Sequence, residues 1–211
     1  MKRRTLLQLS PVALLLVLLS SCYKDPLKDL TEDQSRIYIT NYDTTANFSS
    51  YRTFSIADSV AVVSGNRAVQ KSMNSADRAY VAAVENALTQ RGFVKVARDQ
   101  QPDLGITVSR IMSSYSQVVS YNDYGYYGSY WDPYYWGYAG YDYYFPTYYG
   151  VYNINEEAIA IDIVDLKNGG QNHELKDVWS GLIRGEGIDN PSTIQSQVDQ
   201  LFNQSPYLHI Q

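Results

Sequence analysis

Several short segments of this chain alternate apolar and polar side chains, and this period-two pattern limits the possible folds more than any other feature. Such alternation is typical of β-strands with one buried face, because successive side chains point to opposite faces of a sheet. The segments expected to form strands are residues 36–40, 51–56, 93–96, 103–111, 157–166 and 177–184. The last two flank Asn168-Gly169-Gly170 and are expected to pair as a hairpin. Residues 57–74 are small and polar and are expected to form a loop.

Two further segments place their apolar residues with the period of a helix instead. The first carries Tyr80, Val84, Ala87 and Leu88 on one face. Asn74 or Ser75 is expected to cap its start, Asp77 to occupy its first turn and Gly92 to end it. The second carries Ile194, Val198, Leu201 and Phe202 on one face, with Asn190 expected as its cap, Pro191 as its first residue and Pro206 as its stop.

The order of these segments, β-β-α-β-β-β-β-α, predicts an α+β fold. Strands that follow one another mostly pair as hairpins, so we expect a mostly antiparallel sheet with both helices on one face, a two-layer sandwich. Trp179 alternates with Ile183 and is expected in the core. Residues 35–211 are expected to form a single domain.

The first 22 residues carry the features of a bacterial lipoprotein signal. Lys2, Arg3 and Arg4 precede an apolar run at residues 11–19 that is too short to span a bilayer. Leu19-Ser20-Ser21-Cys22 matches the lipobox, in which the cysteine thiol receives the lipid. We predict a signal peptide at residues 1–21 and a lipidated Cys22 with a polar tether at 22–34. An ordinary secretory signal with a chance cysteine is the alternative. Tyr23, rather than Asp, after Cys22 favours the outer membrane.

Composition and spacing exclude several classes of function. A single cysteine argues against a disulfide framework or a Cys-rich metal site, and a net charge of −5 argues against nucleic acid as a partner. His173 with Glu174 and Asp177 could bind a metal, but a histidine in a turn is usually solvated. Asp162 and Asp165 fall on opposite faces of a strand, and Asp165 is expected to cap the following turn. We therefore predict no enzyme activity, no cofactor and no metal.

Six stretches share a likeness with one known family. In chain order they are NFSSYRTF at 47–54, RGF at 91–93, QPDL at 101–104, AIDIVD at 160–165, VWSG at 178–181 and SP at 205–206. They resemble the patterns D-F-S-x-Y-K-T-(F/Y), K-G-(F/Y), x-P-D-(L/F), L-x-(I/V)-D-x-x-D, x-W-x-G and F-P of the bacterial lipoprotein family of domain of unknown function 4136 (DUF4136). The likeness spans Arg36 to Pro206. The chain departs from these patterns at Asn47 and in a tyrosine-rich insertion, and the resemblance implies no particular activity.

That insertion, residues 121–152, holds 14 of the 21 tyrosines, two tryptophans and one phenylalanine, and no Lys or Arg. Three interpretations remain open: a low-complexity loop, a binding surface, or a hairpin that packs on its own sheet. The residues expected to form a binding surface are Tyr124, Tyr126, Tyr127, Tyr130, Trp131, Tyr134, Tyr135, Trp136, Tyr138, Tyr141, Tyr143 and Tyr144.

Taken together, the sequence predicts a lipoprotein of the cell envelope, anchored to the outer membrane through Cys22. We expect a non-enzymatic interaction or scaffold module that contacts an envelope protein through the tyrosine-rich insertion or through the face of the sheet. A protein that binds a glycan or small ligand is the alternative, and an enzyme is the least favoured.

Overall fold

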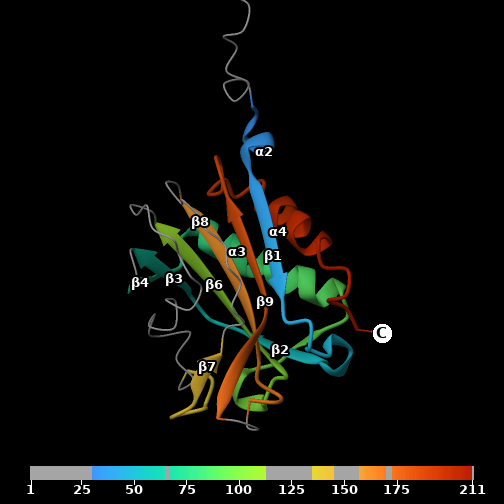
Figure 1. The fold of residues 1–211 in the computed structure, drawn as a ribbon. Coiled ribbons are helices and arrows are strands. Elements are labelled where there is room, and N and C mark those ends of the chain that lie inside the picture. The colour runs from blue at the N-terminus through green and yellow to red at the C-terminus, as the bar shows by residue number, and fades with distance from the viewer. Residues whose placement is uncertain (1–29, 65–66, 113–134, 145–156, 170–172, 211) are drawn as a thin grey trace, which may run out of the picture.

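The computed structural model describes residues 30–64, 67–112, 135–144, 157–169 and 173–210. These residues form one twisted sheet with helices against it (Figure 1). The elements are α2 (Glu32–Ser35), β1 (Ile37–Tyr42), η1 (Phe48–Ser50), β2 (Thr53–Ile56), β3 (Val60–Ser64), β4 (Arg67–Ser72), α3 (Ser75–Gln90), β5 (Val94–Lys95), η2 (Arg98–Gln100), β6 (Leu104–Met112), β7 (Asp142–Tyr144), β8 (Ala158–Asp165), β9 (Glu174–Arg184) and α4 (Ile194–Asn203).

The sheet is mixed rather than mostly antiparallel, although the α+β class is confirmed. The main path of the sheet is β1-β9-β8-β6-β2-β5. Three strands lie off this path: β3 pairs with β6, β4 pairs with β3, and β7 pairs with β9. In the described residues four pairs are antiparallel (β1–β9, β3–β4, β6–β8 and β8–β9) and four are parallel (β2–β5, β2–β6, β3–β6 and β7–β9). Three of the parallel pairs, β2–β5, β2–β6 and β3–β6, have α3 between their strands in the chain, and a helical crossover allows strands to return in the same direction.

The expected loop at residues 57–74 is instead the β3–β4 hairpin, and the predicted order of elements was wrong at this point. Val60 to Val63 form a continuous apolar run, and all four residues are buried. In β3 the side chains on both faces are apolar, so the segment shows no alternation of apolar and polar residues. The period-two pattern therefore could not reveal β3.

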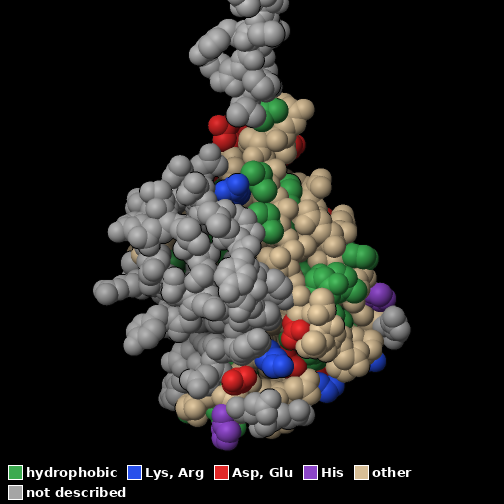
Figure 2. All heavy atoms as spheres, viewed as in Figure 1, with side chains coloured by type: hydrophobic (Ala, Val, Ile, Leu, Met, Phe, Trp, Pro, Cys, Tyr) green, Lys and Arg blue, Asp and Glu red, His purple; other side chains and the backbone are tan. Residues whose placement is uncertain are grey.

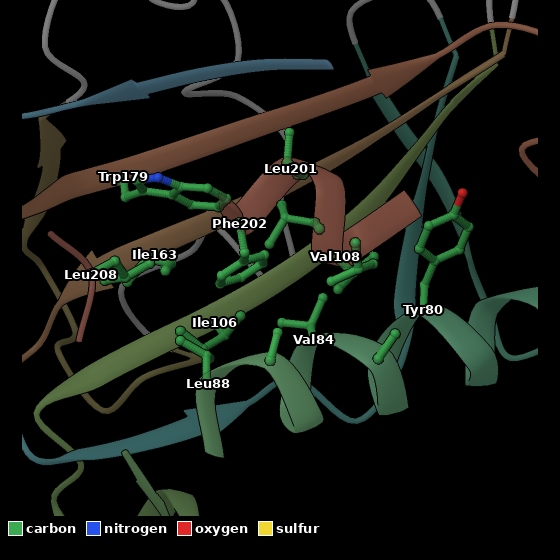
Figure 3. Packing of buried hydrophobic residues seen from close by; sticks show 14 of the residues in the cluster. Tyr80, Val84, Leu88, Ile106, Val108, Ile163, Trp179, Leu201, Phe202 and Leu208 are labelled. Atoms are coloured by element: carbon green, nitrogen blue, oxygen red, sulfur yellow. The ribbon is translucent and has the colours of Figure 1, made fainter. Parts of the chain in front are cut away.

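Helices α3 and α4 pack side by side against one face of the sheet and enclose the main core (Figure 3). Val84 and Leu88 of α3 and Leu201 and Phe202 of α4 are 0% exposed, as both helical patterns predicted. Full burial of such a side chain contributes about 1.5–3 kcal/mol each. The prediction for Trp179 is also confirmed: its ring is fully buried, and its Nε1 donates a hydrogen bond to Ser205 Oγ at 2.8 Å.

The two helices begin differently. Asn74 and Asp77 form the capping box of α3, in which each side chain accepts a hydrogen bond from the other residue's backbone N–H, so this predicted cap is confirmed. The predicted start of α4 was wrong, because the helix begins at Ile194. Asn190 Oδ1 accepts hydrogen bonds from the backbone N–H and hydroxyl of Ser192, which stabilises a turn before the helix.

The opposite face of the sheet carries a second, smaller hydrophobic cluster. Trp136 packs there with Val164 of β8, with Leu166 just after β8, and with Leu175 of β9. Trp136 belongs to the tyrosine-rich insertion. The described part of the insertion ends at Tyr144, the last residue of β7, and β7 pairs with β9. In this part of the chain the insertion packs on its own sheet, as the third interpretation expects, but through a strand parallel to β9; the rest of the expected hairpin lies outside the described residues.

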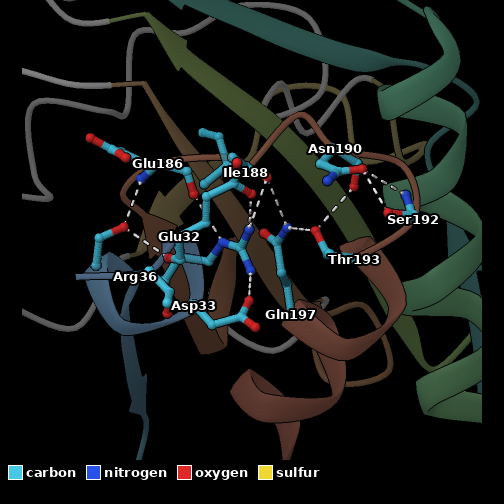
Figure 4. Close-up of polar contacts among 12 residues, drawn as sticks. Glu32, Asp33, Arg36, Glu186, Ile188, Asn190, Ser192, Thr193 and Gln197 are labelled. Carbon is cyan, nitrogen blue, oxygen red and sulfur yellow. Dashed lines mark hydrogen bonds and ion pairs between the residues drawn. The ribbon is translucent and has the colours of Figure 1, made fainter. Parts of the chain in front are cut away.

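A short helix and a buried arginine fix the N-terminal end of the described chain (Figure 4). The predicted tether at residues 22–34 ends in α2, which Thr31 caps. Arg36, whose side chain is 1% exposed, donates to the carbonyl oxygens of Glu186 and Gly187 at 3.0 and 3.2 Å and pairs with Glu32 and Asp33. We call this set of contacts the Arg36 latch. None of the helices in the described residues is both long and apolar enough to cross a membrane.

Candidate functional site

Residues from separate sequence motifs meet at the end of the sheet that lies farthest from α2. There the Tyr51 hydroxyl donates to Asp165 Oδ2 at 2.8 Å, and Asn168 donates to both oxygens of Asp165, from its backbone N–H at 2.9 Å and from its side chain at 2.7 Å. The predicted turn cap by Asp165 is thus confirmed. Burial and the nearby charge of Asp165 raise the pKa of the Tyr51 phenol, so it stays a donor.

Asp103 joins a second pair of motifs next to this cluster. Its Oδ2 accepts hydrogen bonds from the backbone N–H groups of Arg52 and Thr53 at 2.6 and 3.2 Å, and Thr53 Oγ1 accepts one from the Asp103 N–H. Lys167 lies between the two clusters, with its Nζ 2.6 Å from the Ser50 carbonyl oxygen and 3.6 Å from Asp103 Oδ1. The polar groups of the motifs therefore bind one another and build this end of the sheet.

A cavity of about 230 Å³, the Asp165 cavity, opens beside the first cluster. One wall is the segment after β1, and the other is the end of the β8–β9 hairpin. It is lined by Asp43, Thr45, Ala46, Asn47, Ser50, Tyr51, Asp165, Asn168, Gly169, Glu174, Lys176 and Val178. Charged side chains of both signs gather at this lower end of the molecule in Figure 2.

A groove of about 670 Å³, the Trp136 groove, lies on the other side of Lys167. It is lined by Arg98, Gln101, Pro102, Asp103, Trp136, Gly137, Tyr138, Leu166 and Lys167. The Arg98 guanidinium lies 4.6 Å from the centre of the Tyr135 ring, within the range of a cation–π contact. The Tyr138 hydroxyl donates to the Leu166 carbonyl oxygen at 2.5 Å. Cationic and aromatic side chains thus meet at this groove.

The structure describes six of the twelve aromatic residues expected to form a binding surface. Trp136 is 5% exposed and packs into the sheet, whereas Tyr135, Tyr138 and Tyr141 are half-buried. For Tyr143 and Tyr144 only the backbone in β7 is described. The other six, Tyr124, Tyr126, Tyr127, Tyr130, Trp131 and Tyr134, lie outside the described residues, as does Cys22. Of the described members, Trp136 and Tyr138 line the Trp136 groove.

A pair of buried acids that was not predicted lies on the sheet face away from α3 and α4. Asp162 and Asp177 are 0% and 2% exposed, and burial raises the pKa of both carboxyls well above the ordinary value, with a further rise at Asp177 from Asp162. Thr107 and Ser180 lie directly opposite Asp162 on the neighbouring strands. Within the described chain, both oxygens of Asp162 and both of these hydroxyls have no hydrogen-bond partner. As predicted, Asp165 faces the other side, towards Tyr51.

This acid pair is hard to find in a sequence because its two members are 15 positions apart. A break in the β8–β9 register between Ile163 and Val164 decides which residues of the two strands oppose each other. Only the paired strands bring the carboxyls to one face. An aspartate within an otherwise apolar strand, as at Asp162, is the one available signal.

The three residues considered for a metal site are not brought together. His173 is exposed, and its ring lies 4.8 Å from that of Tyr141, while Asp177 is buried in the sheet face described above. In the described ranges, no group of three or more His, Cys, Asp or Glu side chains is arranged to hold a metal ion.

The chain is similar to several solved structures. A DUF4136 family protein from Bacteroides thetaiotaomicron is 29% identical, with a TM-score of 0.67, and the match covers 83% of this chain and 98% of that one. The PelC dodecamer from Paraburkholderia phytofirmans is 14% identical with a TM-score of 0.42 over 83% of this chain and 99% of that one. A PDZ domain protein from Parabacteroides distasonis is also 14% identical with a TM-score of 0.42, over 84% of this chain and 41% of that one.

No curated protein matches the chain. A family model, described as a domain of unknown function (DUF4136), matches residues 39–207, which is most of the chain. The match includes the motif residues that meet around Asp103 and Asp165. The resemblance seen in the sequence is thereby confirmed, and the chain belongs to the DUF4136 family.

Proposed function

We propose that this protein is a lipid-anchored component of the bacterial cell envelope that binds another envelope protein through the Trp136 groove and catalyses no reaction. The observation that carries the proposal is the arrangement of the described part of the tyrosine-rich insertion. This part is held by Trp136 and β7 and places aromatic side chains beside Arg98 and Lys167. A preformed groove of this kind binds without the entropy cost of ordering a loop.

The position of the groove relative to the proposed anchor supports this role. In Figure 1 the N-terminal element α2 lies at the upper end of the sheet, and β7 lies at the lower end. From Cys22 to Leu30 the chain spans at most about 30 Å, because an extended chain covers about 3.3–3.6 Å per residue. A lipid on Cys22 would thus hold the domain close to the membrane, with the groove at the end directed away from it.

The charges of the groove favour an acidic peptide segment over a neutral glycan as the occupant. Arg98 and Lys167 contribute two positive charges against one negative charge from Asp103, while the chain as a whole is acidic. The largely buried side chains of Trp136, Leu166 and Pro102 add apolar groups to the lining. A partner segment with carboxylates next to apolar side chains would match both properties.

The groove is tested with the full lipidated protein cross-linked in native envelopes. The Arg98→Glu variant is expected to lose its cross-linked partner, because it reverses one of the two positive charges. Lys95→Glu is the matched control: Lys95 is exposed and pairs with Glu85 away from the groove. Equal recovery of the partner from both variants and the wild-type protein would exclude the groove as the binding surface.

The anchor is tested separately by Cys22→Ser. This change removes the only thiol that could accept a lipid, so radioactive palmitate is expected to label the wild-type protein and not the variant. The variant is also expected to leave the membrane fraction, because acyl chains supply the membrane affinity. Equal labelling of both forms would contradict the lipoprotein assignment.

A further inference from the structure

We propose that the Asp165 cavity is a second binding site, separate from the Trp136 groove, and that it takes a small neutral polyhydroxylated molecule the size of one sugar ring. The inference does not depend on the function proposed for the groove, since the two sites share no lining residue. It is based on the size of the cavity, the rigidity of its walls and the kinds of polar group that line it.

The size of the cavity limits the ligand to a small molecule. Its volume of about 230 Å³ equals that of about seven or eight water molecules in the liquid, and lies below the range of drug-sized pockets. A single ring with its hydroxyl groups fits such a volume, whereas an oligomer would have to extend out of it.

The walls are fixed by bonds among the lining residues themselves. Asp165 is held by Tyr51 and Asn168, as described above. In the facing segment the Asp43 N–H donates to the Val178 carbonyl oxygen at 3.0 Å, and Asp43 Oδ1 accepts from Thr45 N and Oγ1 at 2.8 and 2.7 Å. The cavity therefore exists before a ligand binds, which lowers the entropy cost of binding.

The lining groups match hydroxyl groups better than other ligand chemistry. Asp43, Asp165 and Glu174 are acidic and Lys176 is the single cation among the residues that line the cavity, so an anion such as a phosphate is disfavoured. Asn47 and Asn168 add amides, which both donate and accept. A ligand with several hydroxyls can donate to carboxylates and accept from amides at once. The described residues also provide no cluster of ligands for a metal ion.

Glu174 is the lining residue best placed to bond a ligand. Its side chain is half-buried at the cavity, and within the described chain it makes no hydrogen bond or ion pair of its own. Its backbone pairs with β7 regardless of the side chain. Replacing Glu174 should therefore weaken binding without disturbing the fold.

The test uses the full lipidated protein in detergent micelles and ligand-observed saturation-transfer NMR. The probes are glucose, galactose, mannose and N-acetylglucosamine, with ethanolamine and inorganic phosphate as contrasting probes. At least one sugar is expected to bind in the millimolar range. Glu174→Ala should weaken this binding about 5- to 10-fold, the loss expected for one hydrogen bond to a charged group. Glu174→Gln, which keeps the side-chain volume, should weaken it less.

Glu186→Ala is the matched control, because Glu186 is an exposed glutamate at the opposite end of β9. It should leave sugar binding unchanged, and so should Arg98→Glu, which alters only the groove. Absence of saturation transfer to every sugar would overturn the proposal, as would stronger binding of ethanolamine or phosphate. Equal effects of Glu174→Ala and Glu186→Ala would overturn it as well. Failure of the groove experiment alone would leave the cavity proposal standing.

Discussion

Asp162 shows how far a single residue can depart from the usual rule that buried acids are paired. It lies in the middle of β8, fully buried, with its two oxygens unpartnered in the described chain. A charged carboxylate in such surroundings is costly, so burial favours the protonated form and raises its pKa. Asp162 and Asp177 interact, so they titrate as a pair rather than separately.

This raised pKa gives the protein a pH dependence of opposite sign to that of a salt-bridged aspartate. In the unfolded chain the carboxyl loses its proton at about pH 4, whereas the folded protein keeps it to higher pH. Between these two values the folded state binds more protons, so the free energy of unfolding falls as pH rises. Below pH 4 this contribution is fully present, and above the raised pKa it is lost.

We expect Asp162→Asn to stabilise the protein at pH 7 relative to wild type by on the order of 1–2 kcal/mol, and to have little effect at pH 4. An amide keeps the size of the side chain and carries no charge to bury. Urea unfolding at the two pH values measures the difference, with the exposed Glu186→Gln as control. Parallel pH profiles for Asp162→Asn and wild type would show that Asp162 is not the titrating group.

Among the elements, α2 depends most on contacts made outside itself. It has four residues, too few to be stable as an isolated helix, and Arg36 joins it to the turn after β9. Gly187 is required in that turn: its φ is +67°, and a Cβ there would lie 2.2 Å from Glu32 Oε2. The Arg36 latch thus sets the direction in which the chain leaves the domain.

Arg36→Ala is expected to release α2 while leaving the main core intact. Hydrogen exchange at residues 31–37 should become at least about tenfold faster, because the change removes several hydrogen bonds worth about 1 kcal/mol or more each. Amides of β6 and β8 should exchange at wild-type rates. Arg78→Ala, which alters an exposed arginine of α3, is the control. Faster exchange in β6 and β8 as well would mean that the Arg36 latch supports the whole fold.

At the same scale, the sequence located strands in which large aliphatic residues alternate with small or polar ones, even where, as in β6 and β8, both faces are buried. The alternating strands β1, β2, β6, β8 and β9 and the two amphipathic helices were located because their patterns have a clear period. It missed β3, whose four buried residues are all apolar. The Asp165 turn was predicted because its contacts are local, whereas the cavity around it depends on the segment at 43–51, more than a hundred residues away.

At the scale of the whole molecule, the sheet separates the large hydrophobic cluster under α3 and α4 from the smaller cluster around Trp136. The cluster under α3 and α4 contains most of the buried apolar residues, and the cluster around Trp136 contains four. Leu201 and Leu175 are both 0% exposed and belong to the larger and the smaller cluster, respectively. The same substitution at both positions therefore compares the two faces directly.

Leu201→Ala is expected to reduce the free energy of unfolding by about 3–5 kcal/mol, near the upper end for such changes, because its surroundings are held by two helices and the sheet. Leu175→Ala should cost about 2–3 kcal/mol, because the smaller cluster can relax into the space left behind. Chemical denaturation monitored by circular dichroism measures both. Equal losses would show that the two faces are equally rigid.

The pairing of β6 with β8 has a consequence for how members of this family can diverge. The two strands are matched residue for residue from Leu104–Asp165 to Ile111–Ala158, so β6 ends and β8 begins at the same end of this strand pair. Lengthening such a connection costs little, about 0.6 kcal/mol for each doubling. The scaffold can therefore accept foreign sequence between these strands as a display site. Exchange of this segment between homologues is expected to leave the core under α3 and α4 in place and to alter the cluster around Trp136.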